Sequence, residues 1–270
     1  MDEKQFLDQF SFSKKWGQNF LIDVKTKERI INYVRSFLFV NPPLLEIGPG
    51  MGALTKELCA NYHLTCVEVD PKLVKYLKSL NLANLTILHQ DCLEPSFNEL
   101  LKENTLIYSN TPYSITSAMI RHFIDEWKNN HCIFLMQQEV AAKISAFENS
   151  SDYGAFSVYV QTFLKIDLLF NVNPSCFYPS PKVSSTLVDL QKNDSELNTD
   201  LNHEHYWSFV SKCFLMRRKT LINNLKTFCS KEMIKLLCDY LHIEESSKIR
   251  AQELSYLQFI ALYKIYEANH

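Results

Sequence analysis

Residues 110–113 have the sequence Asn-Thr-Pro-Tyr, and these residue types suit the binding of a planar exocyclic amine. The side-chain oxygen of Asn110 and the backbone carbonyl of Thr111 can each accept a hydrogen bond from an NH2 group. Pro112 fixes φ in this segment, and Tyr113 offers an aromatic face for stacking. Adenine N6 is the obvious candidate for such an amine. The simpler alternative is a strand-to-helix turn in which Asn and Pro have their usual turn roles.

Short apolar runs alternate with helical patterns around this motif. Buried strands are predicted at 44–47, 64–69, 85–89, 105–109 and 132–136, and helices between them at about 52–60, 71–80, 96–103 and 114–127. A further helix is predicted before the first strand, capped by Asp23 or Thr26 and ended by Pro42 and Pro43. The alternation of strands and helices specifies a parallel, doubly wound α/β sheet.

Glycines and carboxylates follow the first three predicted strands. Gly48, Gly50 and Gly52 lie between the first strand and a helix, where they let a ligand approach free backbone N–H groups. Such a loop suits either a pyrophosphate or an amino-acid carboxylate. Glu68 ends the second strand, about 20 residues further on, where an acidic side chain commonly meets ribose hydroxyls. Asp91 follows the third strand and could accept a hydrogen bond from an adenine amino group.

Four consecutive strand ends therefore carry Gly, Glu, Asp and Asn, with Asn110 on the fourth. Open α/β sheets bind ligands at the carboxyl ends of their strands, so these residues predict a ligand site at that rim. Each acidic residue has the alternative role of capping the helix that follows it. A Rossmann dehydrogenase is the competing interpretation, but it would not explain Asn-x-Pro-Tyr after the fourth strand.

Composition limits the class of protein. With 270 residues, 46% of them hydrophobic and 21% charged, the chain can form one large domain and a smaller one. The N-terminus has no apolar signal region and no run is long enough to span a membrane, so we expect a cytoplasmic protein without a membrane partner. The eight cysteines include no C-x-x-C, which favours buried, reduced thiols and no bound metal.

The charges are unevenly distributed along the chain. The net charge of -2 excludes a protein that is basic all over, so a nucleic acid would have to be held by a local patch. Residues 1–15 are predicted to form a mobile polar arm, 191–200 a polar linker, and the segment from His203 onward a helical domain. Between 212 and 235 there are seven basic residues and one acidic residue. Arg217, Arg218 and Lys219 in this stretch are candidate phosphate contacts, although a solvated helix face is the alternative.

Nine segments together resemble the S-adenosylmethionine-dependent ribosomal RNA adenine N6,N6-dimethyltransferases of the KsgA type, and they extend over nearly the whole chain. These segments are 17–21, 46–52, 67–70, Asp91, 110–113, 138–141, 153–154, 177–183 and 217–221. The resemblance implies a Rossmann-like, seven-stranded class I methyltransferase sheet in residues 1–192, with an antiparallel edge formed by strands near 164–172 and 184–190. It also implies a small, all-helical RNA-recognition domain in residues 193–270.

The resemblance assigns cofactor roles residue by residue. Asn19, Leu21 and Gly48, with Gly50 in the same loop, would lie at the methionine end of S-adenosylmethionine. Glu68 would hold the ribose hydroxyls and Asp91 the adenine.

The same resemblance places Asn110 between the cofactor methyl group and the target amine. Tyr113 and Phe177 would lie on the two faces of a target base that has left its stack. Thr111 stands where the family usually has Leu, which should matter little because the backbone carbonyl acts there. Trp16 and the low net charge are further departures from the family pattern.

The implied activity is dimethylation of N6 on two adjacent adenines in a hairpin near the 3′ end of small-subunit (16S) ribosomal RNA. The implied partner is that RNA or a precursor of the 30S subunit, and we expect the protein to act as a monomer in ribosome biogenesis. An Erm-type enzyme, which modifies large-subunit RNA, is a near alternative, but the Arg-Arg-Lys-Thr-Leu run at 217–221 favours the KsgA type. A non-catalytic RNA-binding module is a second alternative, and the intact Glu68, Asp91 and Asn110 argue against it.

Overall fold

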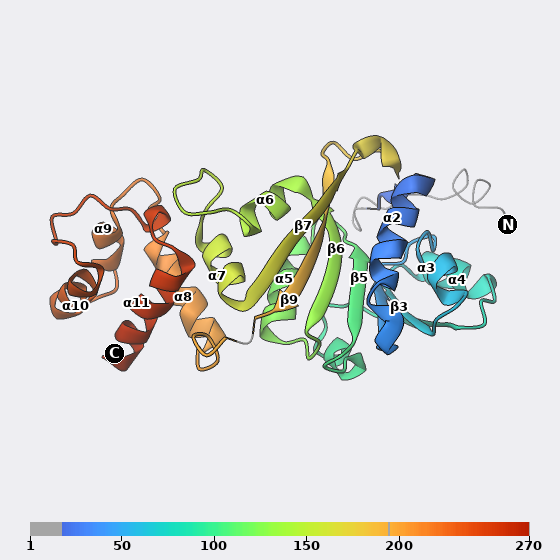
Figure 1. Ribbon diagram of the computed structural model, residues 1–270, viewed down its shortest axis with the longest axis horizontal. Coiled ribbons are helices and arrows are strands. Elements are labelled where there is room, and N and C mark those ends of the chain that lie inside the picture. The colour runs from blue at the N-terminus through green and yellow to red at the C-terminus, as the bar shows by residue number, and fades with distance from the viewer. Residues whose placement is uncertain (1–17, 194, 270) are drawn as a thin grey trace. The chain divides into compact units, whose positions relative to one another are not determined.

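The computed structural model describes residues 18–193 and 195–269 (Figure 1). The predicted arm over 1–15, together with Trp16 and Gly17, lies outside the described residues. The chain divides into two compact units. One unit contains residues up to 141 together with 167–191, and the other contains 142–166 together with 192–270.

A seven-stranded mixed sheet forms the centre of the fold, as predicted. Its spatial order is β4 (Leu85–His89), β3 (Leu64–Glu68), β2 (Leu44–Ile47), β5 (Leu106–Asn110), β6 (His131–Gln137), β9 (Ser185–Lys192) and β7 (Leu164–Val172). The first five strands in this order pair in parallel, and β9 pairs antiparallel with β6. The sheet therefore confirms the Rossmann-like class I methyltransferase architecture, with the reversed strand β9 lying between β6 and the edge strand β7.

Four helices of the first unit begin close to where the sequence predicts. They are α2 (Val24–Arg35), α3 (Thr55–Cys59), α4 (Pro71–Ser79) and α5 (Thr116–Asp125). A fifth helix, α6 (Gln138–Ile144), continues beyond the unit and lies where the sequence analysis predicts none. Short 3-10 helices lie at η2 (Leu38–Val40), η3 (Pro95–Leu100) and η4 (Pro174–Cys176). The helix predicted at 96–103 is thus a shorter 3-10 helix, because Pro95 fixes its first residue and only Phe97 within it is buried.

Two side-chain caps explain where α2 and α4 start. Asp23 precedes α2, and its Oδ1 accepts a hydrogen bond from the Thr26 amide at 2.8 Å. Asp70 does the same for the Lys72 amide at 2.9 Å, and Pro71 occupies the first helical position. Because α4 follows β3 directly, the Asp70 cap fixes how the chain turns away from the carboxyl end of that strand.

One face of the sheet is covered by α2 and α3. Ile30, Ile31 and Val34 from α2 and Leu58 from α3 pack on apolar residues of β2, β3, β5 and β6 in one buried cluster. The spacing of these α2 residues gives the helix one apolar face. A second, two-stranded sheet pairs β1 (Phe20–Leu21) antiparallel with β8 (Phe177–Tyr178) and so fixes the start of the described chain.

The second unit contains the start of β7 and the last residue of β9, and its other regular elements are helices. It includes residues 142–166, which precede most of β7 and all of β9 in the sequence. Its helices are α7 (Ala155–Phe163), α8 (His203–Cys213), α9 (Leu221–Leu225), α10 (Lys231–Leu241) and α11 (Tyr256–Ala268), with a 3-10 helix η5 (Ala251–Glu253). Aromatic rings join α7 to α8, since Tyr159 contacts both Tyr206 and Trp207. This packing explains why residues 142–166 group with the helical unit as well as residues after 192.

All eight cysteines are free thiols, and six of them are buried. Burial is the main reason that the pKa of the Cys66 thiol lies well above its ordinary value. The prediction of reduced cysteines in apolar surroundings is confirmed for these six. Within the described ranges, no helix is long and apolar enough to cross a membrane.

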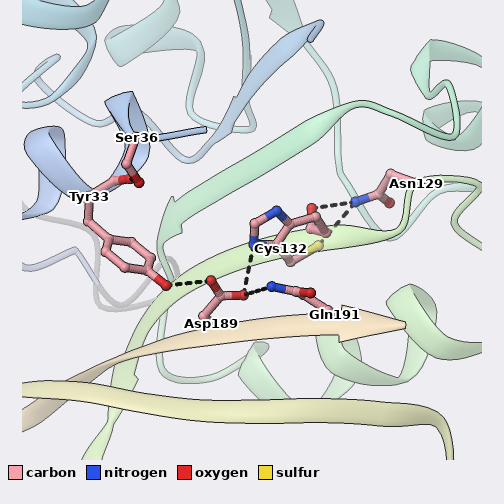
Figure 2. A network of polar contacts seen from close by, with 7 residues as sticks. Tyr33, Ser36, Asn129, Cys132, Asp189 and Gln191 are labelled. Atoms are coloured by element: carbon pink, nitrogen blue, oxygen red, sulfur yellow. Dashed lines mark hydrogen bonds and ion pairs between the residues drawn. The ribbon is translucent and has the colours of Figure 1, made fainter. Parts of the chain in front are cut away.

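A buried carboxylate links α2 to the sheet (Figure 2). Asp189 on β9 is 2% exposed, and it accepts hydrogen bonds from the Tyr33 hydroxyl at 2.6 Å and from His131 Nε2 at 2.7 Å. Burial, and then the contact with Asp189, raises the pKa of Tyr33 well above its ordinary value. The hydroxyl therefore stays protonated and continues to donate to the carboxylate.

We predict that Tyr33→Phe lowers the free energy of unfolding by about 1–3 kcal/mol, because it removes a hydrogen bond to a buried, charged acceptor. Urea unfolding followed by circular dichroism would measure the change. Tyr62→Phe is the matched control, since Tyr62 packs on the same core but its hydroxyl bonds to no described residue. Equal stability losses in the two variants would contradict the prediction.

Candidate active site

The loop after β2 requires glycine for its backbone conformation. Gly48 has φ +65° and Gly50 has φ +57°, a region that residues with a Cβ rarely adopt. Gly50 is also closely packed, since a Cβ there would lie 3.0 Å from two ring carbons of Phe20, which would have to shift slightly. The ring of Phe20 therefore rests directly on the glycine loop. The Gly48 amide donates to the Val67 carbonyl at 2.9 Å and ties the loop to β3.

Glu68, the last residue of β3, has a buried carboxylate that backbone amides hold in place. Oε1 accepts from the amides of Val69 and Asp70, each at 2.9 Å, and Oε2 accepts from Gly50 at 3.2 Å. The side chain is 6% exposed, and this burial raises the pKa of Glu68. A carboxylate has about four lone-pair sites, so Oε2 keeps the capacity for a further hydrogen bond.

Asp91 lies two residues beyond β4 and is partly exposed. Its Oδ1 accepts a hydrogen bond from the Leu93 amide at 2.9 Å, which fixes the turn that follows the strand. Gln18 lies on the same rim, and its Nε2 donates to Asp70 Oδ2 at 2.7 Å. The cap of α4 thus also anchors the start of the described chain.

Asn110 ends β5, and its side chain joins that strand to the N-terminal segment. Nδ2 of Asn110 donates to the Asn19 carbonyl at 3.0 Å. Among residues 18–193 and 195–269, no donor reaches Oδ1 of Asn110 or the backbone carbonyl of Thr111. Both oxygens at this position thus remain available as acceptors. The Thr111 hydroxyl is different, since it is buried without a partner in the same described set.

The two predicted stacking residues are placed differently. Tyr113 lines the cavity beside Asn110, and its hydroxyl lies 2.7 Å from the Ser185 hydroxyl at the start of β9. Phe177 is 2% exposed and packs in the core with Leu21, its cross-strand neighbour in the small sheet. Its side chain does not line the cavity in this structure, so its proposed stacking role stays a prediction.

One cavity brings together most of the predicted site residues. It is lined by Asn19, Leu21, Gly48, Gly50, Glu68, Asp91, Asn110, Thr111, Pro112 and Tyr113, along with Gln18, Phe20, Glu46 and other residues of the rim. Gln18, Asn19, Phe20 and Leu21 come from the segment before α2, and the remaining named groups lie at or just beyond the carboxyl ends of β4, β3, β2 and β5. The strand order therefore explains why Gly48 and Asn110, 62 positions apart in sequence, meet in one cavity. In the described part of the chain, no cluster of His, Cys, Asp and Glu forms a metal site.

Sequence reasoning assigned no role to Glu46 or Ser185. Glu46 lines the cavity from β2, and its Oε2 accepts from the Thr55 and Tyr108 hydroxyls at 2.6 and 2.8 Å. An acidic residue inside an apolar strand was the available signal. Ser185 holds the Tyr113 hydroxyl from 72 positions away, and no local pattern indicates such a pairing.

The predicted RNA contacts lie in the helical unit and differ from one another. The guanidinium of Arg217 donates to the backbone carbonyls of Ser151 and Tyr153, so it holds the loop before α7. Arg218 and Lys219 are exposed, and neither forms an ion pair within residues 18–193 and 195–269. Of the three, Arg218 and Lys219 are therefore the better candidates for phosphate contacts.

Comparisons with known proteins agree with this geometry. The family described as "Ribosomal RNA adenine dimethylase" matches residues 9–268. The "Ribosomal RNA small subunit methyltransferase A" of Mycoplasmoides gallisepticum is 38% identical over 264 residues, which cover 95% of this chain and 94% of that protein. The protein of the same name from Mycoplasma genitalium is 36% identical over 262 residues, covering 96% and 97%.

Two solved structures share the fold. A dimethyladenosine transferase from Plasmodium falciparum superposes with a TM-score of 0.77 at 22% identity, covering 92% of this chain and 98% of that one. The 23S rRNA methyltransferase ErmE superposes with a TM-score of 0.65 at 25% identity, covering 91% and 100%. The first likeness, at this identity, concerns the fold alone.

We predict that Gly50→Ala is more destabilising than Gly48→Ala. Both substitutions place a Cβ in a left-handed conformation, which costs about 1–2 kcal/mol. Only Gly50→Ala also forces the Phe20 ring away, whereas the nearest atom at Gly48 is 3.9 Å distant. Thermal unfolding of the two variants would measure the difference, and an equal loss of stability would contradict the proposed contact.

Proposed function

Because the chain belongs to the ribosomal RNA adenine dimethylase family, we propose that it transfers methyl groups from S-adenosylmethionine to adenine N6 in small-subunit ribosomal RNA. The finer proposal is dimethylation of two adjacent adenines in a hairpin near the 3′ end of that RNA. The observation that carries the assignment is the cavity at the ends of four strands, where Asn110 presents an unused acceptor oxygen. The name shared by relatives that match nearly the whole chain supports the choice of the small subunit.

The cavity fits a positively charged adenosyl cofactor. Glu68 has remaining acceptor capacity for a ribose hydroxyl, and Asp91 lies on the neighbouring strand end, where it could accept from an adenine amino group. The positive φ of Gly48 lets a ligand approach the backbone where a side chain would obstruct it. Asn19 and Leu21 close the cavity on the side of the N-terminal segment.

When bound, S-adenosylmethionine supplies an activated methyl group on a sulfonium. The chain then has to hold the N6 lone pair in line with the bond that breaks, and such positioning can contribute about 7–11 kcal/mol. No strong base is required before attack. The oxygens of Asn110 and Thr111 accept hydrogen bonds from the amine and favour its pyramidal, partly positive form in the transition state.

The target base has to leave its stack before it can enter this pocket. Tyr113 offers one face for the extruded base, because it lines the cavity and Ser185 holds its hydroxyl. Phe177 can offer the second face only if its ring leaves the core, where it is 2% exposed. We therefore assign the initial stacking to Tyr113 and a later contact to Phe177.

Methyl transfer from tritiated S-adenosylmethionine to small ribosomal subunits that lack the modification tests the proposed function. We expect label in small-subunit RNA, at N6 of adenines. Large subunits form the second arm, because the likeness to the 23S rRNA methyltransferase ErmE keeps that substrate as the alternative. Label confined to large-subunit RNA would contradict the proposal, and so would label in neither.

We predict that Asn110→Ala lowers kcat by about a hundred- to a thousandfold, since it removes an acceptor aimed at charge that develops in the transition state. Affinity for either substrate should fall much less. Single-turnover methyl transfer at saturating RNA and cofactor would separate the two effects. Near-normal turnover by a folded variant would leave the residue without its proposed role.

We also propose that Arg218 and Lys219 contact RNA phosphates. Each phosphate contact that is lost should reduce the salt dependence of binding by about one unit. The double substitution Arg218→Gln and Lys219→Gln should therefore lower the slope of log affinity against log salt by about two, with cofactor affinity unchanged.

Filter binding at several salt concentrations would measure that slope. Arg217→Gln is the comparison variant, because it removes one positive charge of the same run together with the hydrogen bonds to Ser151 and Tyr153. We expect it to lower the melting temperature, which the double substitution should leave unchanged. If the salt dependence of RNA binding were unchanged in the double variant, Arg218 and Lys219 would belong to a solvated surface and not to an RNA contact.

A further inference from the structure

The carboxylate of Glu46 is buried in the cavity wall, and the mechanism above assigns it no role. It is 2% exposed, and all three of its hydrogen bonds go to one oxygen, Oε2. The donors are the Thr55 hydroxyl at 2.6 Å, the Tyr108 hydroxyl at 2.8 Å and the Cys66 thiol at 3.6 Å. No donor among the described residues reaches Oε1. A buried carboxylate of this kind is satisfied on one side only.

Among residues 18–193 and 195–269, no cationic side chain lines the cavity to balance this group. Glu46, Glu68 and Asp91 all line it, and none of the described lining residues is Lys, Arg or His. The ionisable groups near Glu46 are Cys59 on α3, Cys66 and Glu68 on β3, and Tyr108 on β5. Each of these is neutral or negative, so none of the described groups around Glu46 supplies a positive charge, and a cationic ligand would supply one.

Two effects therefore act on Glu46 in the free site. Burial raises its pKa to about 7, while the hydrogen bonds from Thr55 and Tyr108 act in the opposite direction. Near neutral pH, a small change in local charge is enough to change the protonation of such a group. A cation bound in the cavity favours the ionised form, and a neutral occupant does not.

We propose that Glu46 is a specificity-determining residue, which lets the pocket distinguish the methyl donor, whose sulfur carries a positive charge, from the product, whose thioether sulfur is neutral. The inference rests on the proposed function. As the methyl group is transferred, the sulfur–carbon bond breaks, the nitrogen–carbon bond forms, the sulfonium becomes a neutral thioether, and the amine proton passes to solvent. Glu46 would be ionised while the cavity holds the positively charged donor, and it would take up a proton from solvent once that charge has gone. The product complex is thereby weakened relative to the donor complex.

Titration calorimetry with the full chain tests this inference, using S-adenosylmethionine and S-adenosylhomocysteine as probes. The two ligands share the methionine ammonium and carboxylate, so the ratio of their affinities cancels the titration of those groups. We expect the ratio to rise in favour of the donor by about tenfold between about pH 6 and about pH 8, because donor binding releases the Glu46 proton. Sinefungin, which carries an amine in place of the sulfonium, should follow the donor.

Glu46→Gln should make the ratio independent of pH, with the affinity for the product changed by less than about threefold. Glu57→Gln is the matched control, because it removes the same charge from an exposed position on neighbouring α3.

Thr55→Val is a second variant that keeps the carboxylate. It removes a hydrogen bond that lowers the pKa of Glu46, so the midpoint of the pH dependence should move to higher pH.

A ratio that does not change with pH in the parent protein would overturn the inference. An unchanged pH dependence in Glu46→Gln, or an unshifted midpoint in Thr55→Val, would do the same. These outcomes leave the proposed function intact, because methyl transfer to small subunits would still occur. Failure to bind any of the three ligands would instead overturn the proposed function together with the inference.

Discussion

The hydrogen bond from Asn110 Nδ2 to the Asn19 carbonyl sets the direction of the amide on which the site depends. A side-chain amide donates through nitrogen and accepts through oxygen, so fixing the donor inside the fold leaves the acceptor for a ligand. Asn19 can hold that donor because the strand after it, β1, pairs with β8, and the Ile22 amide donates to the Cys176 carbonyl at 2.8 Å. Segments about 150 positions apart in sequence thus determine the orientation of one side chain.

Buried carboxylates are the second constraint on this pocket. Burying a charge is costly unless donors satisfy it, and the fold meets this requirement differently at two positions. Backbone amides on both oxygens hold Glu68, whereas hydroxyls and a thiol bind only one oxygen of Glu46. The first arrangement favours a fixed charge that binds a hydroxyl. The second leaves a charge that depends on what occupies the cavity.

The three consecutive basic residues of the helical unit, 217–219, have different surroundings. The guanidinium of Arg217 donates hydrogen bonds to the backbone carbonyls of Ser151 and Tyr153, which precede α7. This contact fixes a loop from one part of the unit against a connection from another. Arg218 and Lys219 remain exposed and carry the charge that the chain as a whole lacks, since its net charge is -2. The assignment of cofactor binding and RNA recognition to separate segments stays a prediction.

The sequence by itself determined the α/β class, the strands of the sheet and the strand-end positions of Gly48, Glu68, Asp91 and Asn110. It could do so because periodicity, glycines and helix caps are local signals. The helix predicted at 96–103 is a shorter 3-10 helix at Pro95–Leu100, because the two kinds of helix share much of their local pattern.

Only the tertiary structure decided which groups share the cavity and how they are held. It buried Phe177 while leaving Tyr113 at the cavity, paired Tyr113 with Ser185, and gave Glu46 three donors from three different elements. It also grouped residues 142–166 with the helical unit. Such contacts join residues far apart in the chain, and their geometry depends on strand order and packing, which no local pattern of residues specifies.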